Sequence, residues 1–283
     1  MQGSAGVVNG AAGLPKVVMS AADGARAEVY LYGAHVTSWI PAGGEEQLYL
    51  SPQADYRPGA SIRGGVPVVF PQFSGMGPLP KHGFLRTLQW KYLGVRHGET
   101  PAAASIPATT TAEFVVADSE HTLALWPHRF RGRLAVTAGG PQLAVGLTIE
   151  NTDDRPFEFT AAQHTYFAVR DLGAVAVEGL GALPFRDAAD GYRDKVQAVS
   201  QLRFEGEVDR IYFNAPRQVT LAEPGRRLAV AAEGFPDVVV WNPGPVRGAT
   251  LDDLPPGGFG RFICIEAAIV GQPVELHPGQ TWQ

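Results

Sequence analysis

Short runs in which apolar and polar residues alternate dominate this chain. In residues 142–152 (QLAVGLTIENT), Leu143, Val145, Leu147 and Ile149 fall on one face of an extended strand. Similar runs, rich in Val, Phe, Tyr, Trp and Thr, recur at 27–39, 112–119, 157–169, 201–213, 226–233, 237–243, 261–270 and 273–282. Gly, Pro and Asp separate them, and no long segment has the 3.6-residue period of a helix. Many short strands with turn signals between them predict an all-β sandwich.

The pattern fits one folded unit. Strand-like sequence continues on both sides of 98–112 (GETPAAASIPATTTA), so we interpret this stretch as a low-complexity loop rather than a linker. Residues 1–14 are mostly small and Gly-rich and predict a flexible tail, which leaves a single domain over 15–283. The whole chain has 283 residues, a size that large β folds reach as one domain.

Composition mainly excludes classes of function. The chain carries a formal charge of −5, and its cations are scattered, which argues against nucleic acid as the main partner. Its single cysteine, Cys264, excludes an intramolecular disulfide and a cysteine-based zinc site and fits a reducing compartment. The N-terminus lacks the basic and apolar regions of a signal peptide, and no run could cross a bilayer. We therefore expect a cytoplasmic protein that does not bind membranes.

Residues 61–90 hold an unusual group of cations. Arg63, Lys81, His82 and Arg86 stand among glycines and prolines, outside any strand or helix period. Glycine lets backbone approach a ligand closely, and proline fixes the loop that carries the side chains. Arginine suits phosphate because its planar fork donates two parallel hydrogen bonds. The segment therefore suggests a site for a small anion, although Arg63 and Arg86 could also form ordinary ion pairs.

Two polar residues interrupt otherwise apolar strands. His164 lies within 157–169, and Glu266 lies within 261–270 on the same face as Cys264. A buried carboxylate is costly unless it is solvated or paired. A His and a Glu presented from a sheet suit proton transfer, because imidazole titrates near neutrality and an apolar site raises the pKa of a carboxylate. The alternatives are a structural histidine and a buried salt bridge, and we expect Cys264 to be a core residue.

The other polar residues carry weaker signals. Asp252 and Asp253 resemble a solvated loop more than a metal site. The sequence has no phosphate-binding glycine loop, dinucleotide fingerprint or serine-hydrolase elbow. The remaining histidines show no metal-ligand spacing and are expected to be structural or on the surface: His35, His97, His121, His128 and His277.

Ordered sequence blocks carry a resemblance to a known family. Two of them are IRGGVPVVFPQF (62–73) and LPKHGFLRTLQW (79–90). Further blocks stand at 31–39 (LYGAHVTSW), 163–167 (QHTYF), 207–214 (EVDRIYFN), 237–243 (DVVVWNP), 263–268 (ICIEAA) and 275–282 (ELHPGQTW). Together they cover nearly the whole chain. It resembles the glucose-6-phosphate 1-epimerases, or hexose-6-phosphate mutarotases, of the aldose 1-epimerase superfamily.

This resemblance implies a fold and a site. The fold would be a large antiparallel β-sandwich of the galactose mutarotase-like type, with the sugar on its concave face and neither metal nor cofactor. By motif, His164 would be the general acid and Glu266 the general base, with the first protonated and the second ionised at rest. Asp209 would accept hydrogen bonds from sugar hydroxyls, and His82 occupies the place of a sugar-contacting histidine.

The resemblance also implies a substrate. Arg63 and Arg86 would bind it, with a 6-phosphate as their natural target, so we expect interconversion of the α and β anomers of an aldohexose 6-phosphate by a monomer. Lys81 departs from the glutamine common at its position, and 251–261 (LDDLPPGGFGR) is also atypical. Lys81 could add charge for phosphate or disturb a hydroxyl contact. The alternatives are an aldose 1-epimerase for neutral sugars and a non-catalytic carbohydrate-binding or sugar-phosphate-binding domain.

Overall fold

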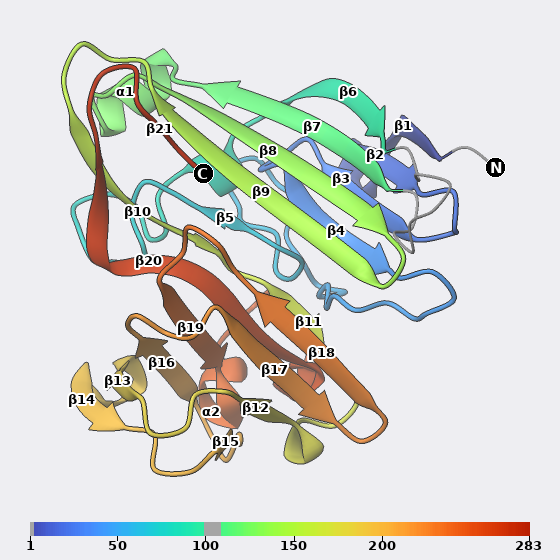
Figure 1. Cartoon of the computed structure of the whole chain (residues 1–283), viewed down its shortest axis with the longest axis vertical. Coiled ribbons are helices and arrows are strands. Elements are labelled where there is room, and N and C mark those ends of the chain that lie inside the picture. Colours follow the sequence, from blue (N-terminus) through green and yellow to red (C-terminus); the bar gives the residue numbers. More distant parts are fainter. Residues whose placement is uncertain (1–2, 99–108) are drawn as a thin grey trace.

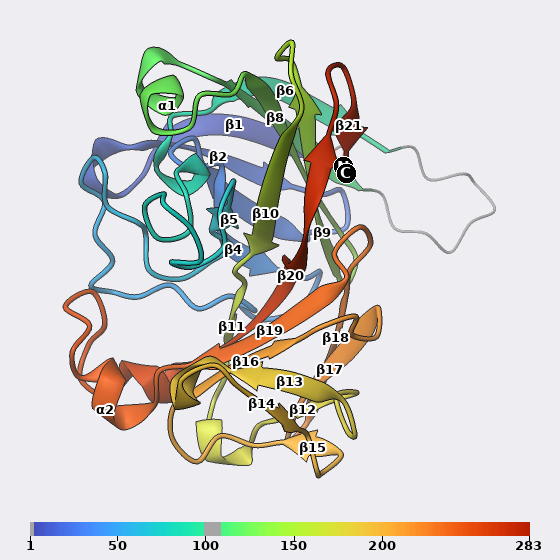
Figure 2. The same cartoon turned by 90° about the vertical axis from the view of Figure 1, so that its left-hand side faces the viewer.

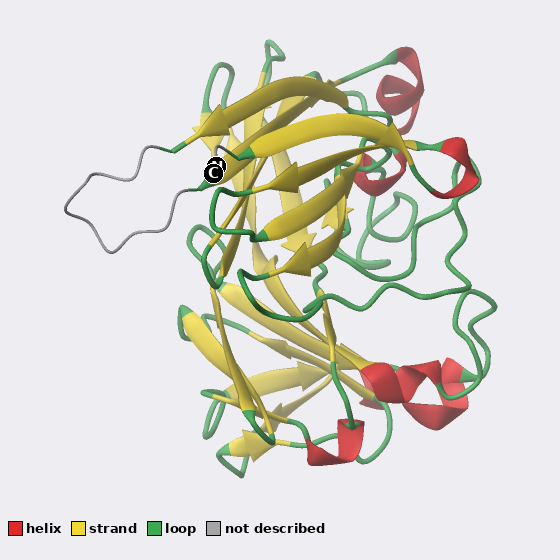
Figure 3. Cartoon of the chain, turned by 90° about the vertical axis from the view of Figure 1, so that its right-hand side faces the viewer, coloured by secondary structure: helices red, strands yellow, loops and turns green. Residues whose placement is uncertain are grey.

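The computed structural model describes residues 3–98 and 109–283. Within these ranges strands dominate, pair antiparallel and form four sheets (Figures 1 and 3). This arrangement confirms the predicted all-β antiparallel fold class. No helix in the described part of the chain is long and apolar enough to cross a membrane.

Two sheets in the upper half of Figure 1 enclose much of the core. The first contains, in spatial order, β1 (Ser4–Asn9), β2 (Pro15–Ser20), β3 (Arg26–Tyr30) and β4 (His35–Ile40). The second contains β21 (Thr281–Trp282), β9 (Gln142–Asn151), β8 (Phe130–Gly139), β7 (Thr110–Ala117) and β6 (Lys91–His97). Inward residues such as Met19, Phe114 and Leu134 are fully buried or nearly so. Removing this apolar surface from water stabilises the fold by roughly 25 cal/mol per Å².

An eight-stranded sheet joins the two halves of the molecule. Its spatial order is β14 (Arg193–Val196), β13 (Pro184–Asp187), β16 (Val208–Tyr212), β19 (Asp237–Asn242), β20 (Phe262–Leu276), β10 (Phe157–Gln163) and β5 (Val68–Val69), with β11 (Tyr166–Ala168) also paired to β20. The long strand β20 runs between the halves in Figure 2. It pairs with β19 on one edge and with β10 and β11 on the other. Its register sets Glu266 opposite Val239, while Asp209 lies opposite Trp241 on the far side of β19.

A four-stranded sheet completes the lower half. It contains β15 (Gln201–Leu202), β12 (Ala176–Glu178), β17 (Gln218–Glu223) and β18 (Arg226–Ala231). Its Val177 and Leu221 join the main hydrophobic core, which draws on all four sheets. The described helices are the short α1 (Glu120–Leu125) and α2 (Gly244–Gly248) and the 3₁₀ turns Ala11–Gly13, Leu85–Thr87, Leu172–Ala174, Ala188–Asp190 and Gly258–Arg261.

The N-terminal segment differs from the prediction. Residues 1–14 were expected to form a flexible tail, but Ser4–Asn9 form strand β1, which pairs with β2 along its whole length. Most β1 side chains are exposed, so the backbone ladder rather than side-chain burial holds this strand. Small residues hide such a strand from a pattern based on hydrophobicity. The predicted loop over 98–112 falls largely on 99–108, outside the described residues, and β7 already begins at Thr110.

Two predicted strands are divided in the structure. Residues 157–169 form β10 and β11, and the break between them contains His164. There the backbone N–H of His164 donates to the carbonyl of Pro67 at 3.0 Å instead of to β20. Residues 201–213 form β15 and β16, separated at Gly206, whose φ of 154° suits glycine. The first break matters for function because it turns His164 out of the sheet ladder.

Candidate functional site

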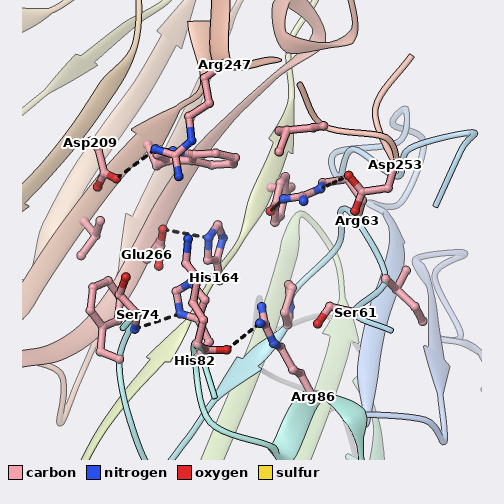
Figure 4. Close-up of a pocket in the computed structure, with 18 of the residues that line it drawn as sticks. Ser61, Arg63, Ser74, His82, Arg86, His164, Asp209, Arg247, Asp253 and Glu266 are labelled. Atoms are coloured by element: carbon pink, nitrogen blue, oxygen red, sulfur yellow. Dashed lines mark hydrogen bonds and ion pairs between the residues drawn. The ribbon is translucent and has the colours of Figure 1, made fainter. Parts of the chain in front are cut away.

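A charged pocket of about 470 Å³ opens where the 61–86 loop meets β11, β16, β19 and β20 (Figure 4). The structure brings together in its wall all seven residues singled out from the sequence: Arg63, Lys81, His82, Arg86, His164, Asp209 and Glu266. They come from five separate stretches of chain, so the fold assembles the site. Tyr166, Trp241 and Val239 supply apolar surface between the polar groups.

A histidine and a glutamate meet at the centre of the pocket. The Nε2 atom of His164 lies 3.3 Å from Oε1 of Glu266, and their side chains are 10% and 2% exposed. The His164 ring stacks on Tyr166, with centroids 4.9 Å apart and planes 13° apart. His164 Nδ1 and Glu266 Oε2 have no hydrogen-bond partner within the described ranges. The glutamate therefore has Oε1 toward the imidazole, while Oε2 is buried without a partner.

The protonation of this pair differs from the sequence-based expectation. Burial, together with the charges of Arg86 and Arg63, lowers the pKa of His164 to about 3. Burial raises the pKa of Glu266 well above 4.5; Asp209 adds to this, while Lys81 and Arg86 oppose it. Both shifts favour the uncharged form, so the substrate-free pocket favours a neutral histidine and a protonated glutamate. The sequence predicted the reverse because it shows neither the depth of burial nor the neighbouring cations.

Two arginines make one side of the pocket cationic, but their surroundings differ. Arg63 Nε donates to Oδ1 of Asp253 at 3.1 Å, and its Nη1 donates to the Tyr166 hydroxyl at 3.0 Å. Arg86 donates through Nη2 to the carbonyl of Lys81 at 2.8 Å, and no carboxylate in the described ranges forms an ion pair with it. Burial lowers the pKa of Arg86 to about 10, as does Arg63, so Arg86 is charged at neutral pH. Its guanidinium is the more available to an anion.

Asp253 corrects one interpretation of the sequence. The segment with Asp252 and Asp253 was expected to be a solvated loop. Asp252 is exposed as expected, but both aspartates line the pocket and Asp253 pairs with Arg63. The ion-pair alternative for Arg63 is therefore correct, whereas Arg86 has no such partner in the described part of the chain. The Asp253 carboxylate also fixes the direction of the Arg63 side chain.

The loop that carries the cations depends on backbone that approaches its neighbours closely. Gly65 has φ of 62°, and a Cβ there would stand 2.1 Å from the carbonyl oxygen of Val36. His35 is buried; its Nε2 lies 2.7 Å from the carbonyl oxygen of Gly64. Burial lowers the pKa of His35 to about 4, so the neutral ring donates from Nε2. These contacts hold the backbone beside Arg63 in place.

His82 lies beside the acid/base pair as a neutral donor. Its Nδ1 accepts the backbone N–H of Ser74 at 3.2 Å, and its ring centroid is 5.5 Å from that of His164. Burial lowers the pKa of His82, and the neighbouring charges of Arg86 and Lys81 act in the same direction. A neutral ring that accepts at Nδ1 carries its proton on Nε2, so His82 can donate a hydrogen bond to a ligand.

The opposite side of the pocket combines a carboxylate with an arginine that the sequence analysis missed. Arg247, on α2, pairs with Glu207 and lies 4.0 Å from Oδ2 of Asp209 (Figure 4). Burial raises the pKa of Asp209 to about 6, against the lowering effects of Arg247 and Lys81. Lys81 is exposed, and the neighbouring charges that act on it most are those of Arg247 and Asp209. Lys81 therefore belongs as much to this side as to the arginine side.

Two further features bear on the chemistry of the pocket. Cys264 is fully buried and packs with Tyr166, Trp241 and Phe262, which confirms its prediction as a core residue. Across the described ranges, no group of three or more His, Cys, Asp and Glu side chains is arranged to hold a metal ion. The groups that the pocket offers are hydrogen-bond donors, charges and the His164–Glu266 pair in contact.

Solved structures share this architecture. A crystal structure described as a "putative mutarotase" from Salmonella typhimurium matches with a TM-score of 0.83 and 27% identity, covering 98% of this chain and 94% of that one. A "galactose mutarotase related enzyme" from Lactobacillus acidophilus matches with a TM-score of 0.71 and 15% identity, covering 99% and 94%, which bears on the fold alone. The fold is thus of the galactose mutarotase-like type, as the sequence predicted.

The family follows from sequence comparison. The model of the aldose 1-epimerase family matches residues 15–283, and the chain belongs to that family. A protein from Cenchrus ciliaris named "Putative glucose-6-phosphate 1-epimerase" is 37% identical over 277 residues, which is 96% of this chain and 83% of the relative. A protein of the same name from Escherichia coli K12 is 35% identical over 252 residues, or 87% and 81%.

Proposed function

We propose that this enzyme interconverts the α and β anomers of an aldohexose 6-phosphate, with glucose 6-phosphate as the substrate to test first. One observation carries the proposal: the His164–Glu266 contact lies between a cationic side with Arg86 and an acidic side with Asp209. Relatives named as glucose-6-phosphate 1-epimerases support the choice of sugar phosphate.

The charges orient the sugar ring. In an aldohexose 6-phosphate the phosphate is carried by C6, which is bonded to C5, and C5 carries the ring oxygen O5. Arg86 and Arg63 are the charges that act most strongly on His164, whereas Asp209 is the one that acts most on Glu266. A phosphate on the arginine side therefore brings O5 toward His164 and the O1 hydroxyl toward Glu266. The other hydroxyls then face Asp209.

The reaction needs two proton transfers. Glu266, as a carboxylate, takes the proton of the O1 hydroxyl, and protonated His164 gives one to O5. The C1–O5 bond breaks and leaves the open-chain aldehyde. Rotation about C1–C2 presents the other face of the carbonyl, and closure with the roles reversed gives the other anomer. Each positioned acid or base typically contributes about 10²–10⁴-fold.

The experiment is a magnetisation-exchange NMR measurement of anomer interconversion. Purified protein is added to glucose 6-phosphate and, separately, to galactose, and the exchange rate above the spontaneous rate is measured for each. Strong acceleration with glucose 6-phosphate alone supports the proposal. Equal or faster exchange with galactose replaces it with an epimerase for neutral sugars. Binding without acceleration of either sugar replaces it with a carbohydrate-binding domain.

A further inference from the structure

The acid/base pair begins in the wrong protonation order for its reaction. In a neutral His164 that accepts the Glu266 proton at Nε2, this nitrogen has no proton of its own to give to O5. A protonated Glu266, in turn, cannot take the proton of the O1 hydroxyl. The burial of both side chains and the directions of both pKa shifts favour this resting order. One proton must therefore pass from Oε1 of Glu266 to Nε2 of His164, atoms that lie 3.3 Å apart. Something in the catalytic cycle has to favour that transfer.

Cations oppose a positive charge on His164. Its direct neighbours among the titratable and charged groups are Glu266 on β20, Tyr166 on β11 and His82. On the arginine side follow Lys81, Arg86 and Arg63 with its partner Asp253. Beyond Glu266 lie Asp209 and Arg247. Asp253 offsets Arg63, but no carboxylate in the described ranges offsets Arg86. After burial itself, the charge of Arg86 is thus the largest obstacle to an imidazolium at this position.

The structure points to the substrate itself as the agent. On the basis of the function proposed above, we propose that the 6-phosphate dianion, bound at Arg86 and Arg63, drives the transfer of the Glu266 proton to His164 and so prepares both groups for catalysis. The O–H bond at Oε1 breaks and an N–H bond forms at Nε2. Glu266 becomes a carboxylate and His164 an imidazolium, and no proton is exchanged with the solvent.

The geometry gives the transfer its direction. Figure 4 shows Arg63 and Arg86 on one side of His164 and Glu266 on the Asp209 side. A dianion at the arginines is therefore nearer to the imidazole, whose positive charge it stabilises, than to the carboxylate, whose negative charge it opposes. An opposite charge within about 4–6 Å shifts a pKa by roughly one to three units, so the prepared pair gains roughly tenfold to a thousandfold in population. The phosphate then acts on kcat as well as on KM.

The first experiment separates the phosphate from the sugar. Xylose lacks the C6 arm, and phosphite dianion supplies the charge without a bond to the sugar. Exchange of xylose anomers is followed by NMR with increasing phosphite, after subtraction of the rate that phosphite gives without enzyme. We expect a saturable rise of roughly tenfold or more in the enzymatic rate. A free anion cannot tether xylose, so such a rise reports on the catalytic pair.

Matched variants locate the effect. Arg86→Ala should abolish activation by phosphite, whereas Arg217→Ala should retain it. Arg217 is 86% exposed and lies 3.9 Å from Glu233, outside the pocket. If glucose 6-phosphate is exchanged rapidly but phosphite leaves xylose exchange unchanged, the phosphate serves only as a tether and this inference is wrong. If glucose 6-phosphate is not exchanged at all, the proposed function itself fails.

The second experiment observes the proton. The ligands 1,5-anhydroglucitol 6-phosphate and 1,5-anhydroglucitol lack the O1 hydroxyl and cannot open, and they differ only in the phosphate. The ¹⁵N resonances of His164 are assigned by their loss in His164→Asn and recorded with each ligand at saturation. We expect imidazolium shifts with the phosphate and neutral shifts without it. Neutral shifts in both complexes, or imidazolium shifts in both, would overturn the inference.

Discussion

Replacing Arg86 is the sharpest test of phosphate recognition. Arg86 has no carboxylate partner in the described part of the chain, so Arg86→Ala removes an available cation without leaving a buried anion behind. A hydrogen bond to a charged group contributes about 1.5–3 kcal/mol. Its loss should lower kcat/KM for glucose 6-phosphate by about one to two decades. For glucose, which has no phosphate, the same change should have much less effect.

Arg63→Ala is expected to behave less simply. Arg63 binds Asp253 and the Tyr166 hydroxyl, so its removal leaves a pocket carboxylate and a buried phenol without their donor. Part of its effect should therefore appear as lower thermal stability, which Arg86→Ala should not share to the same extent. Melting temperatures from calorimetry distinguish the two variants.

The assay compares exchange rates for both sugars in wild type, Arg86→Ala and the remote control Arg217→Ala. Rates are measured by magnetisation exchange over a range of sugar concentrations, so that kcat and KM are obtained separately. Equal losses for glucose and glucose 6-phosphate in Arg86→Ala would refute the assignment of Arg86 to the phosphate. They would favour an enzyme for neutral sugars in which Arg86 has a structural role.

The remaining predictions concern the pair and the opposite side of the pocket. Glu266→Gln and His164→Asn should each abolish anomer exchange but still bind glucose 6-phosphate, as measured by calorimetry. The double variant should be scarcely less active than either single variant. A normal exchange rate in Glu266→Gln would refute the mechanism. If Lys81 contacts the phosphate, Lys81→Gln should weaken the binding of glucose 6-phosphate, and this difference from the wild type should shrink at high salt. If Lys81 contacts only solvent, the substitution should leave the kinetics unchanged. Arg247→Gln should move the acid limb of kcat/KM to higher pH, since loss of its charge raises the pKa of Asp209 above about 6; an unmoved limb would show that Asp209 is not required as a carboxylate. Glu266→Gln should also reduce the loss of thermal stability at alkaline pH, as measured by calorimetry.

The local alternation of apolar and polar residues was enough to predict most of the strands. Alternation located the strands that bury their inner faces, such as 142–152 in β9, because one buried face imposes a two-residue period. It failed where burial does not hold the strand, as in β1, and where a strand is interrupted, as at His164. Both failures have one physical cause: backbone hydrogen bonds, which leave little mark on composition, decide these segments.

Some residues of the candidate site could be predicted from the sequence, and others could not. Residue type and pattern singled out six of the seven residues, and the motif resemblance added Asp209 and the role of each residue. Arg247 was missed and Asp253 was assigned to a solvated loop, because their importance comes from contacts with Asp209 and Arg63, which lie 38 and 190 positions away in the sequence. A local sequence pattern does not show contacts between residues that lie so far apart in the chain. The protonation of the pair escaped for the same reason, since it depends on burial and on charges from other segments.

Burial of the acid/base pair lowers the stability of the free protein on both sides of neutrality. The pKa of Glu266 is raised above 4.5, so the folded chain binds a proton that the unfolded chain lacks, and stability falls as pH rises above about 4.5. The pKa of His164 is lowered from 6.5 to about 3, so stability falls as pH drops through that window. Glu266→Gln cannot ionise and removes the alkaline loss, which is why its melting temperature should depend less on pH above neutrality. If that dependence equals the wild type's, Glu266 is ionised in the free protein, and the resting order from which the proton transfer was inferred is wrong.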